Sequence, residues 1–425
     1  MGAAKTLMGG AVAVAALLVA AQCSIYDESL LAPTARTVTP KGGVGWWSGA
    51  GDRGCFSARR PRPEDRPAPG SLKELPPIYL AVQSTRLGSL GEDGGLDDQA
   101  WKDIGFDLDG VCTGVDSCTG DDSPPSCQPT VPQISLDGND CRDNTFGRLE
   151  YAAALVPELS KTYGLNDDAF NCALCVGDYN YLFRVSGYNG EENDDQVRVD
   201  LYPSPGLEVP LPWDCTNPSW KTHPCFTPDN QFTLSADALA TPKAGPDAAE
   251  AKVFDAHAYV RDGYLVVQLP DDTMFWFPGY KALVVAYPVK LQKGVVAGKL
   301  SRGADNVWRI ADGTMGGRVR STDVVTGFRQ LGLCDKDPNY KVMKEFVDRN
   351  LDVLADGRND SQATCDAMSA GIAFTAQQVV AGKIATVEPL VECVLRGTAS
   401  DGGTDAARAH DAAPDAPTDA ADSGG

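Results

Sequence analysis

The acidic, cysteine-rich stretch at residues 103–141 holds the side chains best suited to binding chemistry. Its aspartates lie among glycine and proline residues, which favour turns over helices and strands. Carboxylate oxygens near glycine turns are ligands that calcium takes in proteins. Asp107 and Asp109, in Asp107-Leu108-Asp109-Gly110, are therefore candidate calcium ligands. The spacing does not match an EF-hand, and solvated turns account for these residues, so no metal or cofactor is predicted and calcium is the alternative.

Cysteine usage indicates a disulfide framework. The chain has 13 cysteines, an odd number, and Cys23 is set aside below as a lipid attachment residue. We read Cys172 and Cys175 as structural, because a redox CxxC motif needs a βαβ context. Local bridging of Cys215 and Cys225 would pin a loop with no pattern of its own. The twelve disulfide candidates are Cys55, Cys112, Cys118, Cys127, Cys141, Cys172, Cys175, Cys215, Cys225, Cys334, Cys365 and Cys393.

No catalytic residue is assigned from the sequence. The chain has three histidines and lacks the GxSxG, HExxH, Walker and strand-linked GxGxxG motifs. Paired carboxylates can hydrolyse a glycosidic bond, but no pair stands out among 58 acidic residues. The net charge of −21 argues against nucleic acid as a partner, because phosphate backbones are bound by clustered lysine and arginine.

Trp46 and Trp47 are the candidate ligand-binding residues. An adjacent aromatic pair beside Cys55 can form an exposed platform for sugars. The alternative is that the pair packs onto the domain that it precedes.

The N-terminus has the pattern of an export signal. Residues 1–22 have a positive charge at Lys5 and an apolar run too short for a comfortable membrane span. The segment resembles a bacterial lipoprotein signal, which implies acylation of Cys23, although Gln22 stands where a small residue is usual. Ordinary secretion after Ala21 is the alternative. We expect an exported protein of the outer membrane or cell surface, held by its acylated N-terminus.

Composition divides the rest of the chain into three parts. Residues 23–75 are rich in Pro and Gly and read as a tether. Residues 76–395 read as a disulfide-bonded, β-rich globular region with a sub-boundary near 235–250. Residues 396–425 are an Ala, Asp and Gly tail that cannot bury enough apolar surface to fold, so both termini are expected to be disordered.

Alternation of apolar residues predicts the fold class. Residues 179–185 and 197–201 alternate on either side of a polar loop, which predicts a β-hairpin with an acidic tip. Further short strands, with turns at 270–272 and at Asp312-Gly313, favour an antiparallel β-sandwich. Residues 340–354 form an amphipathic pattern, so we expect a few helices packed on the sandwich and loops held by disulfides.

Three phrases carry a family resemblance: residues 23–31, residues 97–113 and residues 365–376. The chain resembles a group of cysteine-rich secreted lipoproteins of myxobacteria, for which we know of no assigned activity. The resemblance implies export and disulfides and adds no catalytic residue. We therefore predict a non-enzymatic binding or structural module of the cell envelope, with a glycan or an envelope protein as partner. The alternative is a carboxylate-based hydrolase acting on an envelope or extracellular polymer.

Overall fold

The computed structural model describes residues 45–50, 56–91, 94–114, 125–131, 135–156, 167–215, 221–241, 249–278, 286–386 and 393. Four predictions fall outside these ranges: the signal segment expected at residues 1–22, the lipid attachment residue Cys23, the disulfide candidates Cys55 and Cys118, and the tail at residues 396–425.

Eight antiparallel strands close into a barrel, so the predicted β-sandwich is wrong. Neighbouring strands pair in the order β11-β12-β14-β3-β5-β6-β8-β9, and β9 pairs with β11 to complete the circle. Alternating apolar residues fit one buried face in either architecture, so the sequence pattern does not encode closure. The barrel strands are β3 (Ile78–Arg86), β5 (Asn180–Ser186), β6 (Asp194–Ser204), β8 (Val253–Arg261), β9 (Tyr264–Gln268), β11 (Ala286–Arg302), β12 (Trp308–Arg320) and β14 (Ala367–Ala385).

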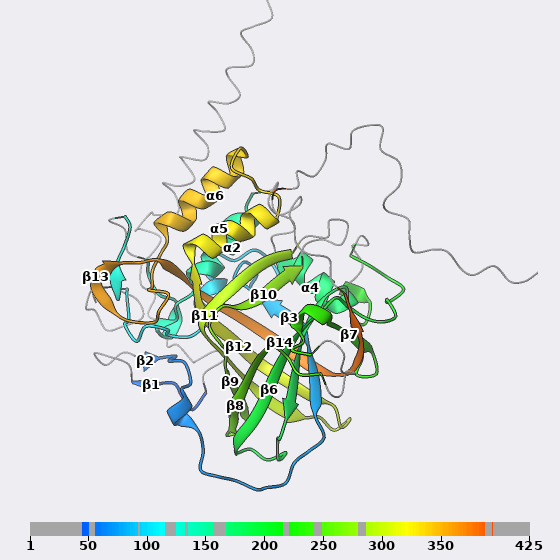
Figure 1. The fold of residues 1–425 in the computed structure, drawn as a ribbon. Coiled ribbons are helices and arrows are strands. Elements are labelled where there is room, and N and C mark those ends of the chain that lie inside the picture. The colour runs from blue at the N-terminus through cyan, green and yellow to red at the C-terminus, as the bar shows by residue number, and fades with distance from the viewer. Residues whose placement is uncertain are drawn as a thin grey trace, which may run out of the picture.

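Shorter elements surround the barrel. In Figure 1, helices α2, α5 and α6 lie at its upper end; α2 packs on β14, α4 on β3 and α5 on β11. The helices are α2 (Thr145–Ala154), α4 (Asp167–Val176), α5 (Ser321–Gln330) and α6 (Pro338–Arg349). The remaining strands are β1 (Gly49–Ala50), β2 (Phe56–Ser57), β4 (Cys127–Gln128), β7 (Gln231–Ser235), β10 (Thr273–Pro278) and β13 (Asp360–Thr364). Within the described ranges, no helix is both long and apolar enough to cross a membrane.

Local sequence signals explain several of these elements. The β5–β6 hairpin has the predicted partners, with Val185 opposite Val199. Helix α6 begins at Pro338, whose missing N–H costs nothing in the first turn, and the Asp337 side chain caps it by accepting a hydrogen bond from the Asn339 backbone N (2.8 Å). Residues 312–313, expected as a turn, instead form a bulge inside β12, where Asp312 has φ of 50°.

The interior of the barrel is filled by side chains. Leu80, Phe183 and Val199 belong to the main apolar core, and Phe183 stacks on Phe374 with ring centroids 5.9 Å apart. The outward side of β8 and β9 carries a second apolar cluster, which includes Tyr259. Two segments, residues 56–70 and residues 103–114, lie over the outside of the barrel. The second of them carries the candidate site.

The first covering segment is the Pro-rich arm at residues 56–70. We expected a solvated tether, but here the arm lies along the barrel. The Tyr259 hydroxyl donates to the Arg62 carbonyl (2.7 Å), and the Arg261 guanidinium donates to the Asp65 carbonyl (2.8 Å). Proline fixes an extended backbone whose carbonyls are free to accept such bonds from β8.

Among the described residues, five disulfides tie the loops to this framework. They join Cys112 to Cys141, Cys127 to Cys365, Cys172 to Cys215, Cys175 to Cys225 and Cys334 to Cys393. The cysteines of the CxxC motif lie on α4 and take separate partners, which agrees with a structural role. The expected local bridge between Cys215 and Cys225 is wrong, because each is bonded to α4 instead.

Candidate functional site

The second covering segment, residues 103–114, lies directly on the outer face of β12 and β14. Two strand glycines allow this close approach. A Cβ atom on Gly371 would lie 2.6 Å from the Gly105 Cα, and one on Gly316 would lie 2.7 Å from the Phe106 ring. Only residues without side chains fit at those strand positions. The loop carrying Asp107 and Asp109 is thereby held against the sheet.

Three carboxylates meet in this loop region. Each of Asp107, Asp109 and Asp143 offers one oxygen atom, and the three atoms lie within 4.8 Å of one another. The Asp143 Oδ2 accepts hydrogen bonds from the backbone N of Leu108 (2.7 Å) and Asp109 (3.3 Å). The Asp109 Oδ1 accepts one from the backbone N of Val111 (2.8 Å). The sequence identified Asp107 and Asp109, and the structure adds Asp143.

A small cavity adjoins these carboxylates. Its volume is about 10 Å³, and its walls include Asp109, Asp143, Asp137 and Asp352. That volume is close to what one water molecule or one ion occupies. Asp137 is held by the backbone N of Thr113, which donates to its Oδ2 (2.5 Å). The site therefore has room for a single small species among four carboxylates.

The electrostatics of the cluster oppose ionisation. Burial raises the pKa of Asp143 well above its usual range, and the charges of Asp109 and Asp137 raise it further. Burial likewise raises the pKa of Asp137 well above the usual range, with Asp109 as the next cause. Desolvation also raises the pKa of Asp352, although hydrogen bonds from Ser369 and Thr145 oppose this. Ionised carboxylates at this density need a compensating positive charge.

One positive side chain reaches the cluster from β12. Arg318 is 1% exposed, and its Nη2 donates to the Leu108 carbonyl (2.6 Å), between the two aspartates of the loop. Its Nε and Nη1 have no hydrogen-bond partner. Burial lowers the pKa of Arg318, and the charges of Asp143 and Asp109 oppose that effect. One guanidinium offsets only part of the negative charge around it.

Two disulfides frame the cluster. Cys112 lies three residues after Asp109, and its partner Cys141 lies two residues before Asp143. The second bond joins Cys127 to Cys365, and Cys365 lines the cavity. The cysteines and aspartates that the sequence places in one stretch therefore belong to a single structural unit.

The tryptophan pair lies elsewhere and is largely covered. Trp47 is 2% exposed and contacts Phe106 and Tyr264 edge-on, with ring centroids 6.4 Å and 5.0 Å apart. Trp46 is half-buried, and its Nε1 donates to the Arg261 carbonyl (2.9 Å). The arrangement favours the packing interpretation over an exposed sugar platform.

Another buried acid lies between α2 and α4. Glu150 has no hydrogen-bond partner for either carboxylate oxygen, and burial, followed by the charge of Asp167, raises its pKa well above the usual range. Asp167 in turn accepts a hydrogen bond from the Leu87 backbone N (2.8 Å). The sequence gave no signal for this pair, because both residues lie in ordinary helical patterns.

The molecule is thus an eight-stranded antiparallel barrel with a disulfide-framed carboxylate cluster on its outer face. No protein-family model, curated protein or solved structure matches the chain. The site must therefore be interpreted from its own geometry. Packed carboxylates around a cavity the size of one ion are suited to cation binding.

Proposed function

We propose that this protein is an exported, non-enzymatic binding or structural module of the cell envelope, anchored to a membrane through acylated Cys23. The observation that carries the proposal is the set of five disulfides that hold the loops of the barrel. Such bonds form and persist in oxidising compartments and are rare in the cytosol. The signal-like N-terminus and the resemblance to secreted lipoproteins point the same way.

The carboxylate cluster gives little support to the alternative, a glycoside hydrolase. Such enzymes use two carboxyl groups about 5–9 Å apart, on either side of a bound sugar. Here three carboxylates contribute oxygens within 4.8 Å, and the adjoining cavity of about 10 Å³ is far too small for a sugar ring. A pocket for an organic ligand typically measures some hundreds of Å³.

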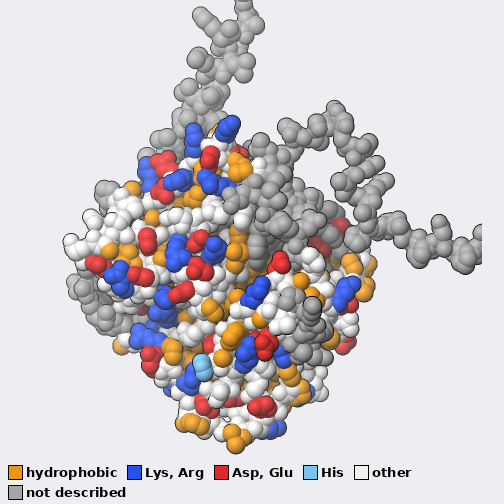
Figure 2. Space-filling model, viewed as in Figure 1, with side chains coloured by type: hydrophobic (Ala, Val, Ile, Leu, Met, Phe, Trp, Pro, Cys, Tyr) orange, Lys and Arg blue, Asp and Glu red, His pale blue; other side chains and the backbone are white. Residues whose placement is uncertain are grey.

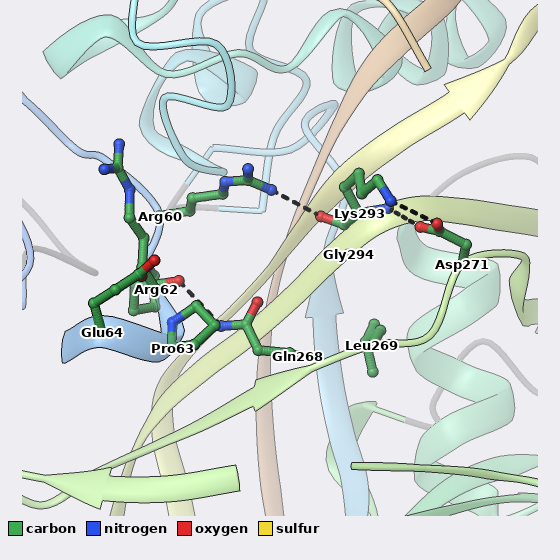
Figure 3. Close-up of a pocket in the computed structure, with 10 residues that line it drawn as sticks. Arg60, Arg62, Pro63, Glu64, Gln268, Leu269, Asp271, Lys293 and Gly294 are labelled. Carbon is green, nitrogen blue, oxygen red and sulfur yellow. Dashed lines mark hydrogen bonds and ion pairs between the residues drawn. The ribbon is translucent and has the colours of Figure 1, made fainter. Parts of the chain in front are cut away.

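A second, open pocket has the size that a ligand needs. It measures about 360 Å³ and lies between the Pro-rich arm and the turn after β9 (Figure 3). Arg60, Arg62 and Lys293 line it, together with Glu64 and Asp271. Lys293 is already paired with Asp271 at 2.7 Å, so the two arginines supply the remaining positive charge.

The arginines define what this pocket would bind. Arg60 donates to the Lys293 carbonyl at 3.3 Å, and burial, followed by the charges of Arg318 and Arg62, lowers its pKa to about 10. A guanidinium with this surplus of neighbouring positive charge favours an anionic group. On a chain of net charge −21, whose visible face mixes both signs (Figure 2), the pocket is a local cationic site. We propose an acidic group of an envelope polymer as its ligand.

Anchoring is tested by expressing the full chain in a bacterium that processes lipoproteins. We expect membrane fractionation and an acyl mass increment on the N-terminal cysteine. Cys23→Ser should abolish both. An unprocessed chain found in the cytosol with free thiols would contradict the proposal, and intact mass before and after reduction reports the closed bonds.

Binding is tested with the purified mature protein on arrays of acidic and neutral envelope polymers. We expect retention by acidic polymers that weakens with salt, because the contacts are between charges. The double variant Arg60→Gln, Arg62→Gln should lose this binding. The double variant Arg309→Gln, Arg349→Gln, an equal change of charge at two exposed positions that do not line the pocket, serves as the control and should retain it. Equal loss in both variants would show that net charge, rather than this pocket, governs retention.

A further inference from the structure

A buried hydroxyl group beside the carboxylate cluster lacks a hydrogen-bond partner. Ser126 is 5% exposed, and its Oγ has no hydrogen-bond partner. The hydroxyl faces the Asp109 carboxyl outside hydrogen-bonding geometry, yet near enough to lower the pKa of that carboxyl against the larger effect of burial. A buried hydroxyl without a partner costs free energy. A species bound among the carboxylates would give this oxygen a partner.

The charge of the cluster indicates the sign of that species. Asp107, Asp109 and Asp143 bring oxygens together, and two of them, Asp109 and Asp143, line the cavity. Asp137 and Asp352 line it as well. The charges of Asp143, Asp109 and Asp352 act on Arg318, whose Nε and Nη1 have no hydrogen-bond partner. The charge of Asp107 also acts on Arg60. Five carboxyl groups around one buried guanidinium cannot all ionise without a further cation, so a species that binds the ionised cluster carries positive charge.

We propose that one calcium ion binds where this cavity adjoins the three carboxylates, with Asp107, Asp109 and Asp143 as ligands and with Asp137 and Ser126 near them. Calcium takes six to eight oxygen ligands in irregular geometry, at about 2.3–2.6 Å. Magnesium retains several waters, for which a cavity of about 10 Å³ has no room. Zinc prefers nitrogen and sulfur ligands, whereas the cysteines at this site are in disulfides.

The ion would connect three segments that are distant in the sequence. Asp107 and Asp109 lie in the loop on β12, Asp143 precedes α2, and Ser126 precedes β4. The hydrogen bonds from Leu108 N and Val111 N already orient Asp143 and Asp109 through one oxygen each. Calcium would therefore complete a preformed site and stabilise the disulfide-framed loops. This role goes beyond the proposed envelope function and does not depend on it.

The test is calcium titration of the mature protein after removal of metal with EGTA. We expect one calcium ion per chain by isothermal titration calorimetry, and a rise of several degrees in the thermal midpoint. Equimolar magnesium should give a much smaller rise. Absence of heat and of any midpoint shift with calcium would overturn the proposal. A midpoint shift of equal size with magnesium would also overturn it.

Two isosteric variants separate metal binding from a structural role. In Asp143→Asn, the side-chain oxygen still accepts from Leu108 N, but the negative charge is gone. We expect the EGTA-treated variant to be at least as stable as the EGTA-treated parent, with calcium affinity weakened at least about tenfold. Asp109→Asn should behave alike, and it keeps the test available if the first variant does not fold. Asp305→Asn, at an exposed turn, is the control and should bind calcium like the parent. Unchanged calcium affinity in both cluster variants would refute the site.

Discussion

The Cys112–Cys141 bond gives the sharpest prediction about this molecule, because it links stability to the carboxylate cluster. The bond closes a loop with a sequence separation of 29. In the chain-entropy model, a loop of that length corresponds to about 3.5 kcal/mol of stabilisation. The perturbation is the double variant Cys112→Ala, Cys141→Ala. Alanine is chosen because both cysteines are buried, and a serine hydroxyl there would add a desolvation cost.

The Cys334–Cys393 bond provides a matched control. Its sequence separation is 59, so the same model gives about 4 kcal/mol, slightly more than for the first bond. It lies at the α5–α6 connection and frames none of the carboxylates. Removing either bond should therefore lower stability by a similar amount, while only the first removal frees the loop between Asp109 and Asp143.

The assay is urea unfolding of each variant without reductant, in calcium and in EGTA. We expect both variants to lose about 3–4 kcal/mol in EGTA, and only the Cys112 and Cys141 variant to lose calcium affinity as well, by at least about tenfold. The reasoning fails if both variants bind calcium equally well. It also fails if removing the 29-residue link leaves the unfolding midpoint unchanged.

Three further predictions concern other parts of the molecule. Glu150→Gln should raise stability at about pH 8 and change it little at about pH 4. The folded-state pKa of Glu150 lies above its unfolded value, so the parent protein loses stability as pH rises from about 4.5. Thermal unfolding of both proteins across this pH range measures the difference. Trp47→Ala should cost about 3–5 kcal/mol in urea unfolding, whereas a sugar platform would lose only binding. Gly371→Ala should lower the thermal midpoint, because its Cβ would lie 2.6 Å from the Gly105 Cα and force the loop off β14.

Local patterns in the sequence were reliable where the partners are close in the chain. The β5–β6 hairpin follows from two alternating segments and the polar loop between them. Closure of the barrel depends instead on β9 meeting β11, for example Val266 against Ala297. The alternation in those strands is the same whether the sheet closes on itself or packs on a second sheet. That is the physical reason why a sandwich was predicted and a barrel is found.

Residues that disfavour strands nevertheless lie inside two long strands, β12 and β14. Asp312-Gly313 has turn chemistry, yet β12 continues through it as a bulge, because its neighbour β14 pairs on both sides of the irregularity. Strand β14 itself is rich in alanine and glycine, which have weak strand preference. Its Gly371 is needed for the contact with the loop at Gly105, so a tertiary requirement outweighs local propensity there.

The candidate site could be predicted only in part, because its residues are distant from one another in the sequence. Asp107 and Asp109 stood out because glycine and cysteine surround them; Asp352 has no such neighbours, and Asp143, although it follows Cys141 by two residues, is far from Asp109 along the chain. The signal that would have found Asp143 is the pairing of Cys112 with Cys141, which cannot be deduced from spacing alone. Once that pairing is known, the loop ends must meet, and the aspartates beside them must share one environment. The Cys112–Cys141 disulfide holds the carboxylates of the cluster together against their mutual repulsion. A bound cation would offset the negative charge that causes this repulsion. For this reason we expect calcium and the disulfide to stabilise the same loops cooperatively, so that the loss of either weakens the contribution of the other.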